Sequence, residues 1–249
     1  MTAALPITLL GHGRLGSALA EGWRLTGAAT PTILTRANQP ACPVDTRALV
    51  IAVKPGTWRE AVTRLAASVP PGAIVISVMA GVRAADIASV LSRPIARVMP
   101  TTAVAQAQGV AAIWSQDAAA RAMAHDLFDP VADAVDLDQE ALLDPATAVA
   151  GSAPAFFHAF AQALALAGTE AGLPPEAAER LARGALRSAG AGAATDASLD
   201  DLVARIASPG GTTRAGLDAL AEAGLGEAAM AAVDAAVARA RTLAGDQTS

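Results

Sequence analysis

The sequence predicts an α/β domain over residues 1–140, followed by an all-α domain over residues 141–249. Two observations support this division. Short apolar runs rich in valine and isoleucine alternate with helical patterns as far as about residue 137, and no strand-like run occurs after about residue 140. Such alternation is typical of a parallel sheet with helices on both faces. Uninterrupted apolar runs are typical of strands covered on both sides.

The first domain contains candidate strands at residues 7–10, 31–35, 48–53, 73–79, 95–99, 109–115 and 133–137. Helical patterns begin at about Arg14 and cover about 57–68, 83–91 and 117–128. The segment 37–47, between the second and third strands, is short and holds two prolines. We therefore expect no full crossover helix there.

The second domain shows helical patterns at about 141–172, 175–193, 198–206, 213–223 and 226–244. The apolar tract 153–168 contains Pro154, His158 and Gln162, which favours a buried helix of a soluble protein over a membrane span. The sequence Gly151-Ser152-Ala153-Pro154 predicts a kink. Residues 155–168 and 226–240 are apolar on more than one helical face, so a monomer would expose a large patch. We therefore expect a homodimer formed through this domain.

Composition excludes several classes of protein. With 53% hydrophobic and 16% charged residues, general disorder is excluded. A net charge of −5 without a basic block argues against nucleic acid as a partner. Cys42 is the only cysteine, so no internal disulfide is expected, and a reducing cytoplasm fits. The start of the chain lacks the basic region of a signal peptide, and its histidines share no metal-binding spacing, so no metal is expected.

A glycine loop follows the first strand. Gly11-His12-Gly13-Arg14-Leu15-Gly16 is a G-x-G-x-x-G that ends a strand, opens a helix and begins an alternating region. That context favours a Rossmann-like dinucleotide site. In such a site the first glycine allows the tight turn, the second admits the pyrophosphate and the third lets the helix pack on the strand.

The end of the second strand indicates which dinucleotide binds. It reads Leu34-Thr35-Arg36, with no acidic residue to bind the ribose hydroxyls of NAD. Arg36 suits a 2′-phosphate, and Thr35 could add a hydroxyl donor. The alternative is that Arg36 is an ordinary surface residue. The absence of an acid favours NADPH, with NADH possible but weaker.

Two further segments each allow two interpretations. Lys54 follows a buried strand, where ligands bind in such sheets, and it could contact ribose or phosphate or simply be a solvated lysine. The stretch ASPGGTTRAG at 207–216 combines glycines, hydroxyls and free N–H groups at a helix start. It suits a small anion, or it is a tight turn with a threonine N-cap.

The chain resembles pyrroline-5-carboxylate reductase over nearly its whole length. The resemblance rests on GHGRLG at 11–16, AVKP at 52–55, SVMAGV at 77–82, RVMPTT at 97–102, AGSAPAFF at 150–157, AGLPPEAA at 171–178 and, most specifically, SPGGTTRAGL at 208–217. It implies an α/β cofactor domain and a helical dimerisation domain that together reduce a cyclic imine acid. Family members pair as homodimers or assemblies of dimers, with sites combining both kinds of domain.

Site residues follow from this resemblance by position. Cofactor contacts are implied for Ala52, Val53, Lys54, Pro55, Val78, Met79 and Ala80, beside the glycine loop, Thr35 and Arg36. Substrate contacts are implied for Glu140, Ser208, Gly210, Gly211, Thr212 and Thr213. We expect Thr213 to be the central side chain, because one hydroxyl can hold the imine nitrogen while N–H groups of about Gly210 to Thr213 bind the carboxylate.

The sequence departs from the family pattern at Thr101, where asparagine is usual, at Ala153, where glycine is usual, and at Met79, where a small residue is usual. The sequence therefore does not define the catalytic efficiency or the identity of the imine substrate. Two alternatives also stay open. A β-hydroxyacid dehydrogenase would place a lysine on the first long helix of the second domain, and residues 141–172 contain none. A non-catalytic NADP(H) sensor is the other.

Overall fold

The computed structural model describes residues 5–38 and 41–245, and it divides the chain into two compact units. The sheet unit comprises the chain up to Gly151 together with the chain from Ala236 onward, and the helical unit runs from Ser152 to Ala235. In this division the sheet unit continues past residue 140, and the domain boundary predicted there stays a prediction. The physical reason is packing, because Leu143 is buried with Ala112 and Trp114 of the sheet.

The sheet unit holds a seven-stranded sheet in its described residues, with the order β2-β1-β3-β4-β5-β6-β7. The strands are β1 (Ile7–Leu10), β2 (Thr32–Leu34), β3 (Ala48–Ile51), β4 (Ile74–Ser77), β5 (Ile95–Pro100), β6 (Gly109–Trp114) and β7 (Ala132–Asp136). All neighbours are parallel except β5 and β6. The predicted parallel sheet is confirmed, with one antiparallel pair in it. Residues 101–108 alone join these two strands, and a parallel crossover needs a dozen or more residues.

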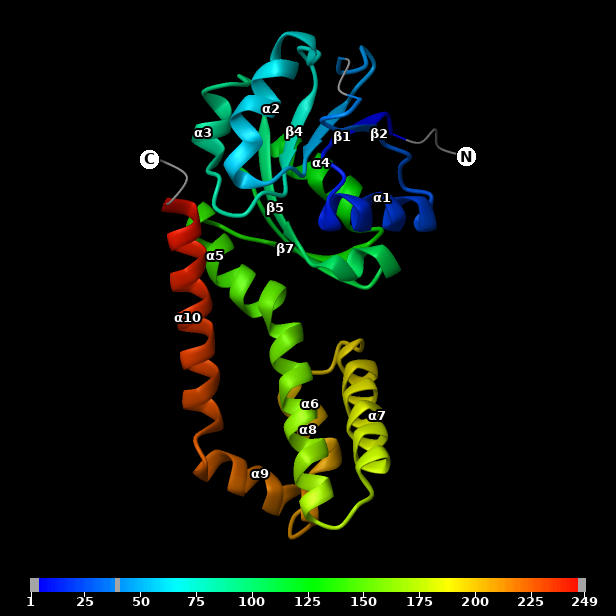
Figure 1. Cartoon of the computed structure of the whole chain (residues 1–249), viewed down its shortest axis with the longest axis vertical. Helices are drawn as coiled ribbons and strands as arrows, with labels where there is room; N and C mark the ends of the chain where they lie inside the picture. Colours follow the sequence, from blue (N-terminus) through cyan, green and yellow to red (C-terminus); the bar gives the residue numbers. More distant parts are fainter. Residues whose placement is uncertain (1–4, 39–40, 246–249) are drawn as a thin grey trace. The chain divides into compact units, whose positions relative to one another are not determined.

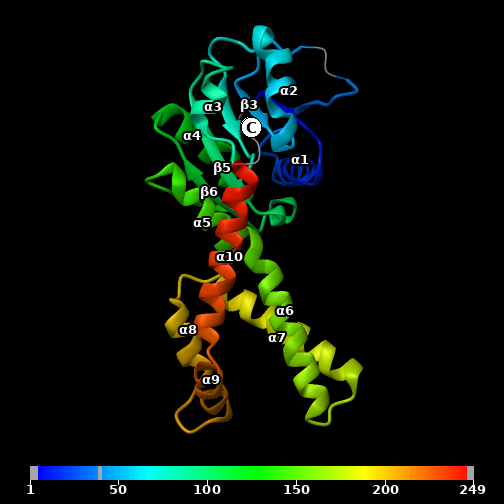
Figure 2. The same cartoon turned by 60° about the vertical axis from the view of Figure 1, so that its left-hand side comes forward.

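Helices cover both faces of the sheet, as predicted (Figures 1 and 2). On one face, α1 (Arg14–Thr26) and α4 (Ala118–Phe128) build the larger core, where Trp23 donates from Nε1 to Leu127 O at 2.6 Å and meets the Phe128 ring edge-on. On the other, α2 (Trp58–Leu65) and α3 (Ala84–Ala88) build the second core. Among the described residues of 35–47 there is no helix, as expected.

The remaining elements also follow the predicted order. A short α5 (Leu143–Ala146) and a π-helical turn, Thr147–Ser152, precede α6 (Ala153–Glu170). The π turn occurs where the sequence predicts a kink. The further helices are α7 (Pro175–Ala193), α8 (Leu199–Ile206), α9 (Thr212–Glu222) and α10 (Leu225–Gly245), and α10 ends within the sheet unit.

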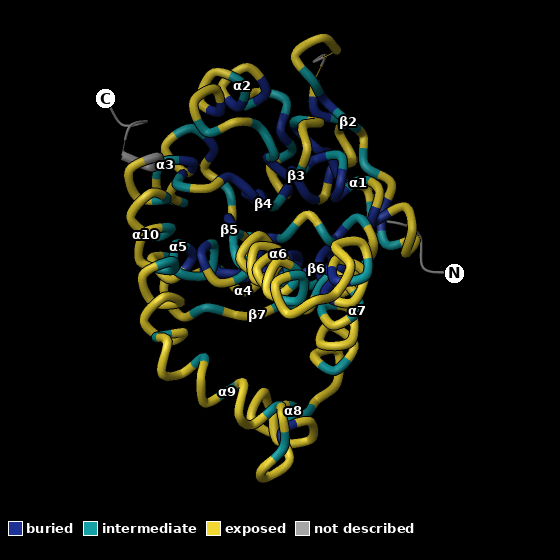
Figure 3. The backbone as a smooth tube through the Cα atoms, turned by 60° about the horizontal axis from the view of Figure 1, so that its bottom comes forward, coloured by how far each residue is buried: buried dark blue, intermediate teal, exposed yellow. Residues whose placement is uncertain are grey.

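The helical unit buries little of itself (Figure 3). Within residues 152–235 the buried positions are Ala178, Ala182 and Ala207, all small. Large side chains of α6 are open instead, with Phe157 61% and Leu166 65% exposed. The expectation of a buried tract at 153–168 is wrong for the single chain, whereas the expected exposed patch is present. By length and composition, the helical stretch Glu140–Glu170 could also cross a membrane.

Candidate functional site

The predicted cofactor residues follow strand ends that lie in one row of the sheet. Strand register aligns Leu34, Leu10, Ile51 and Ser77, the last residues of β2, β1, β3 and β4. The turns that follow are tied to neighbouring strands, because Gly11 N donates to Leu34 O, Ala52 N to Leu10 O and Val78 N to Ile51 O, at 2.8, 2.8 and 3.1 Å. Ligands of open α/β sheets bind at the carboxyl ends of strands, so this edge is the candidate site.

The three glycines of the loop have three different environments. Gly11 has φ +104°, and a Cβ there would lie 2.6 Å from Ala52 O. A Cβ on Gly16 would lie 2.4 Å from Gly11 O, so helix α1 can approach the loop only with glycine here. Gly13 has an ordinary φ of −78° and no atom within 4 Å of its Cβ position. The protein itself therefore does not require glycine at position 13, and the open space there fits a pyrophosphate.

A cavity of about 380 Å³ opens beside this loop. The predicted residues on its wall are Gly11, His12, Gly13, Thr35, Arg36, Ala52, Val53 and Lys54. Helix α2 and the turn before it add Thr57, Glu60 and Arg64 to the wall, and no sequence motif had marked these three residues. Glu60 and Arg64 pair with one another one helical turn apart, so Arg36 and Lys54 leave the wall with a positive balance suited to phosphates.

The predicted cofactor residues Arg14, Leu15 and Pro55 are not among the residues that line this cavity, and their contacts with the cofactor stay predictions. Arg14 is exposed at the first position of α1, and Leu15 packs against the larger core. Pro55 begins the 3-10 turn that follows Lys54, and the Lys54 carbonyl accepts the N–H of Thr57 at 3.0 Å.

The side chain of Thr35 closes the turn after β2, and its contact with the cofactor stays a prediction. Its hydroxyl donates to Asn38 Oδ1 at 2.6 Å, and its N–H donates to the same oxygen at 2.7 Å. The hydroxyl proton is therefore committed to closing the turn after β2. Arg36 lies exposed within that turn and on the cavity wall. Asn38, which the sequence analysis missed, thus fixes the backbone that carries Arg36.

The turn Val78-Met79-Ala80 leaves the same edge of the sheet from β4. Met79 is 4% exposed and packs in the second core, so its side chain points away from solvent. Ala80 is exposed, and Gly81 follows with φ +72°. A large residue at position 79 therefore leaves the outer side of this turn free. Of the three departures from the family pattern, this one does not narrow the site.

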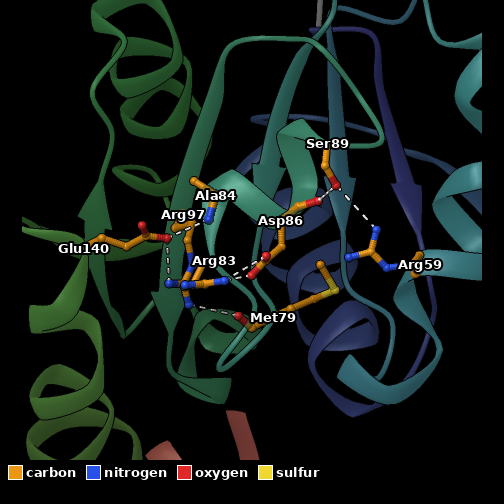
Figure 4. A network of polar contacts seen from close by, with 8 residues as sticks. All are labelled: Arg59, Met79, Arg83, Ala84, Asp86, Ser89, Arg97 and Glu140. Atoms are coloured by element: carbon orange, nitrogen blue, oxygen red, sulfur yellow. Dashed lines mark hydrogen bonds and ion pairs between the residues drawn. The ribbon is translucent and has the colours of Figure 1, made fainter. Parts of the chain in front are cut away.

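Glu140 is held by the start of α3 and by β5 rather than standing free. Its Oε1 accepts the N–H of Ala84 at 2.7 Å and a guanidinium N–H of Arg97 at 2.9 Å (Figure 4). Nearby, Arg83 donates two hydrogen bonds to Asp86 and thereby holds the pKa of that carboxyl below its usual value. The substrate contact expected of Glu140 stays a prediction.

In the helical unit, the segment 208–213 forms the start of α9. Gly210 has φ +71°, which favours glycine, whereas a Cβ on Gly211 would lie 2.7 Å from Ser208 Oγ, a side-chain atom that can rotate away. Gly211 is the N-cap, and its N–H donates to Ser208 O at 3.1 Å. No side chain caps this helix, so the alternative of a threonine N-cap is wrong.

Thr212, Thr213 and Arg214 are the first residues of α9, and none of their N–H groups has a backbone acceptor in the described chain. The N–H groups of a helix start carry a partial positive charge and suit an anion. Thr213 is half-buried, whereas Thr212 and Arg214 are exposed. Arg214 adds a cation beside these donors, and its Nη1 lies 3.9 Å from Asp218 Oδ1.

The other two departures also have local explanations. Thr101 Oγ1 accepts the N–H of Val110 at 3.1 Å and so supports the turn from β5 to β6. Ala153 is the first residue of α6, directly after the π turn. In the described residues no group of histidine, cysteine and acidic side chains could hold a metal ion.

Comparison with known proteins shows one consistent family. The family description "Pyrroline-5-carboxylate reductase dimerisation" matches residues 140–243. A pyrroline-5-carboxylate reductase of Pseudomonas aeruginosa is 30% identical over 238 residues, which span 85% of this chain and 86% of the relative. One of Synechocystis is 35% identical over 190 residues, spanning 72% and 68%.

Solved structures show the same fold. A pyrroline-5-carboxylate reductase of Coxiella burnetii aligns with a TM-score of 0.83 at 25% identity, covering 96% of this chain and 98% of that one. A pyrroline carboxylate reductase of Plasmodium falciparum, solved with NADP bound, aligns with a TM-score of 0.77 at 22% identity and the same coverage.

Proposed function

This chain belongs to the pyrroline-5-carboxylate reductase family, and we propose that it reduces 1-pyrroline-5-carboxylate to L-proline with NADPH, the last step of proline biosynthesis. The enzyme is an oxidoreductase acting on a CH–NH group. The helical unit supplies the substrate-binding start of α9, and the sheet unit supplies the cofactor site.

The observation that carries the substrate assignment is the uncapped N-terminus of α9. A ring imine with one carboxylate needs donors for two oxygens, and the N–H groups of Thr212, Thr213 and Arg214 are free for them. Because Gly210 and Gly211 have no side chains, a ligand can approach this backbone closely. The carbonyl of Ser208 accepts the N–H of Gly211 at 3.1 Å, which helps to hold the turn.

We assign to Thr213 the contact with the imine, which is the reacting end of the substrate. The hydroxyl of Thr213 holds the imine nitrogen and so orients the ring for reduction at the adjacent carbon. NADPH, when bound, supplies the hydride. A protonated imine is already electrophilic, and addition of hydride to its carbon leaves a neutral amine. No strong general base is required, which agrees with the residue types of the loop.

For the cofactor, the space at Gly13 and the cations on the cavity wall fit the pyrophosphate and a 2′-phosphate. Arg36 is the residue assigned to the 2′-phosphate, because the turn after β2 offers no acid for the ribose hydroxyls. NADH binds more weakly because it lacks the group that Arg36 recognises.

The partner of the exposed face of α6 is a second copy of the chain. The match to a dimerisation domain covers this helix, and the single chain leaves its large side chains open. His158 and Gln162 lie within the same tract, and a bilayer would leave them without partners. We assign the chain to the cytoplasm as a homodimer, or an assembly of dimers, that binds no nucleic acid or membrane.

Turnover by the purified protein tests the function, and Thr213→Val tests the site. We expect consumption of NADPH with 1-pyrroline-5-carboxylate, and a fall in kcat/KM of about ten-fold or more in Thr213→Val, or about 1.4 kcal/mol, with NADPH affinity kept. Thr213→Ser keeps the hydroxyl and is the matched control. Binding of NADPH without turnover would instead identify a sensor. Unchanged turnover with a lower Tm would make Thr213 a purely structural residue.

A further inference from the structure

Arg97 is a buried cation that the function proposed above does not use. Its side chain is 8% exposed, and Nη1 lies 2.9 Å from Glu140 Oε1. Its Nη2 donates to Met79 O at 3.4 Å, whereas its buried Nε has no hydrogen-bond partner in the described structure. A buried ion pair is a weak source of stability because desolvation offsets the attraction. Stability alone therefore does not explain an arginine at this position.

The Arg97–Glu140 pair holds both ends of one turn (Figure 4). Arg97 binds the carbonyl of Met79, where the chain leaves β4. Glu140 accepts the N–H of Ala84, the first residue of α3. Between these two points Ala80 is exposed and Gly81 has a left-handed φ of +72°. The Arg97–Glu140 ion pair thus fixes the backbone at Met79 and at Ala84, on either side of the exposed turn.

The same turn lies at the cofactor edge of the sheet. Arg97 is paired with Ser77, so it extends the row that Leu10 and Ile51 form at the ends of β1 and β3. The guanidinium therefore lies one strand beyond the strand end that leads into the turn. A change in its contacts would move the backbone of this turn, which lies at the cofactor edge.

We infer that Arg97 and Glu140 are positioning residues that set the turn Val78–Arg83 against the cofactor. This inference rests on the proposed function only in that the cofactor is NADPH. It gives Glu140 a role distinct from direct contact with the substrate.

The test compares Arg97→Met, Arg97→Lys and Glu140→Gln, singly and in the pair Arg97→Met with Glu140→Gln. We expect Arg97→Met to weaken NADPH binding about ten-fold in a fluorescence titration and to leave the KM for the imine within about two-fold. Arg97→Lys should recover part of the affinity. The double variant should be no worse than Arg97→Met, because both changes break one interaction.

Arg93→Met is the matched control for loss of a structural arginine. Arg93 precedes the same strand, and it donates to the carbonyls of Pro70 and Val69 at 3.0 Å each. It should lower the Tm and leave NADPH binding unchanged. The inference is overturned if Arg97→Met behaves like Arg93→Met, or if Glu140→Gln raises only the KM for the imine. The NADPH titrations contain no imine, so the comparison of Arg97→Met with Arg93→Met is independent of whether the wild-type protein turns over the imine. The comparison of KM values follows once that turnover has been measured.

Discussion

The two units of this chain bury their apolar residues to very different degrees. The sheet unit encloses large side chains, among them Trp23, Phe128, Leu19 and Ile76, each less than 2% exposed. The helical unit buries only alanines in its described residues, while phenylalanines and leucines of α6 stay open. Fully burying a leucine or phenylalanine stabilises by about 1.5–3 kcal/mol, so the helical unit of one chain lacks its main source of stability. We conclude that the sheet unit is largely self-sufficient and the helical unit depends on a partner.

The largest expected effect breaks that partnership. Leu166→Glu places a charge on the exposed face of α6. In a two-fold dimer the substitution occurs in both chains, so the free energy of association should weaken by about 3–6 kcal/mol. We expect the dimer dissociation constant to rise at least about 100-fold, with loss of turnover, in sedimentation and activity measurements. Leu25→Glu is the control, because Leu25 is 57% exposed on α1 of the sheet unit and Leu166 is 65% exposed. If the wild-type protein were a stable, active monomer, the conclusion that the helical unit depends on a partner would be wrong.

Within the sheet unit, Gly16→Ser should lower stability, whereas Gly13→Ser should lower NADPH affinity. Gly16→Ser brings a Cβ to 2.4 Å from Gly11 O and should destabilise by about 1–3 kcal/mol. Gly13→Ser meets open space and places a favourable residue at the N-cap of α1, so its Tm should be kept. Its NADPH affinity should fall about ten-fold or more, because the side chain enters the phosphate space. Denaturant unfolding and NADPH titration measure the two effects. Equal Tm losses would show that Gly13 is needed by the fold.

Arg36→Ala tests whether residues of the sheet unit alone set the preference for NADPH over NADH. Loss of one charge-assisted contact should weaken NADPH binding by about 1.5–3 kcal/mol and leave NADH binding nearly unchanged. The same difference should appear in the dissociated Leu166→Glu protein. Arg24→Ala, which removes an exposed charge from α1, is the control. An equal loss for NADPH and NADH would reject the assignment of Arg36.

The smallest effect concerns pH and again lies in the sheet unit. His125 on α4 faces Asp129 at 2.9 Å and Asp136 of β7 at 3.3 Å, and its pKa is raised from 6.5, chiefly by the hydrogen bond with Asp129. Arg121 also lies 3.8 Å from Asp136. A raised pKa means that the stabilisation is fully present below the unfolded value and is lost as pH rises through the folded value.

We therefore expect His125→Gln to destabilise by less than about 1 kcal/mol near pH 5.5, where the imidazole is charged and aspartates are ionised. The difference from wild type should vanish towards about pH 9, in thermal unfolding of the sheet unit. Dimer dissociation should show no such dependence. If the stability difference between wild type and His125→Gln grew as the pH rose, the raised pKa of His125 would be contradicted.

The sequence alone determined the order of the elements, the glycine loop and the family, because these depend on local patterns. Periodicity, glycine spacing and the absence of an acid after β2 are all visible within short windows. The tertiary structure decided what depends on contacts between distant segments. It reversed β6, committed the hydroxyl of Thr35 to Asn38, turned Met79 into the core, and joined Glu140 to Arg97, 43 positions away. Which groups remain free to bind a ligand is known only once the protein's own hydrogen bonds and packing have been satisfied.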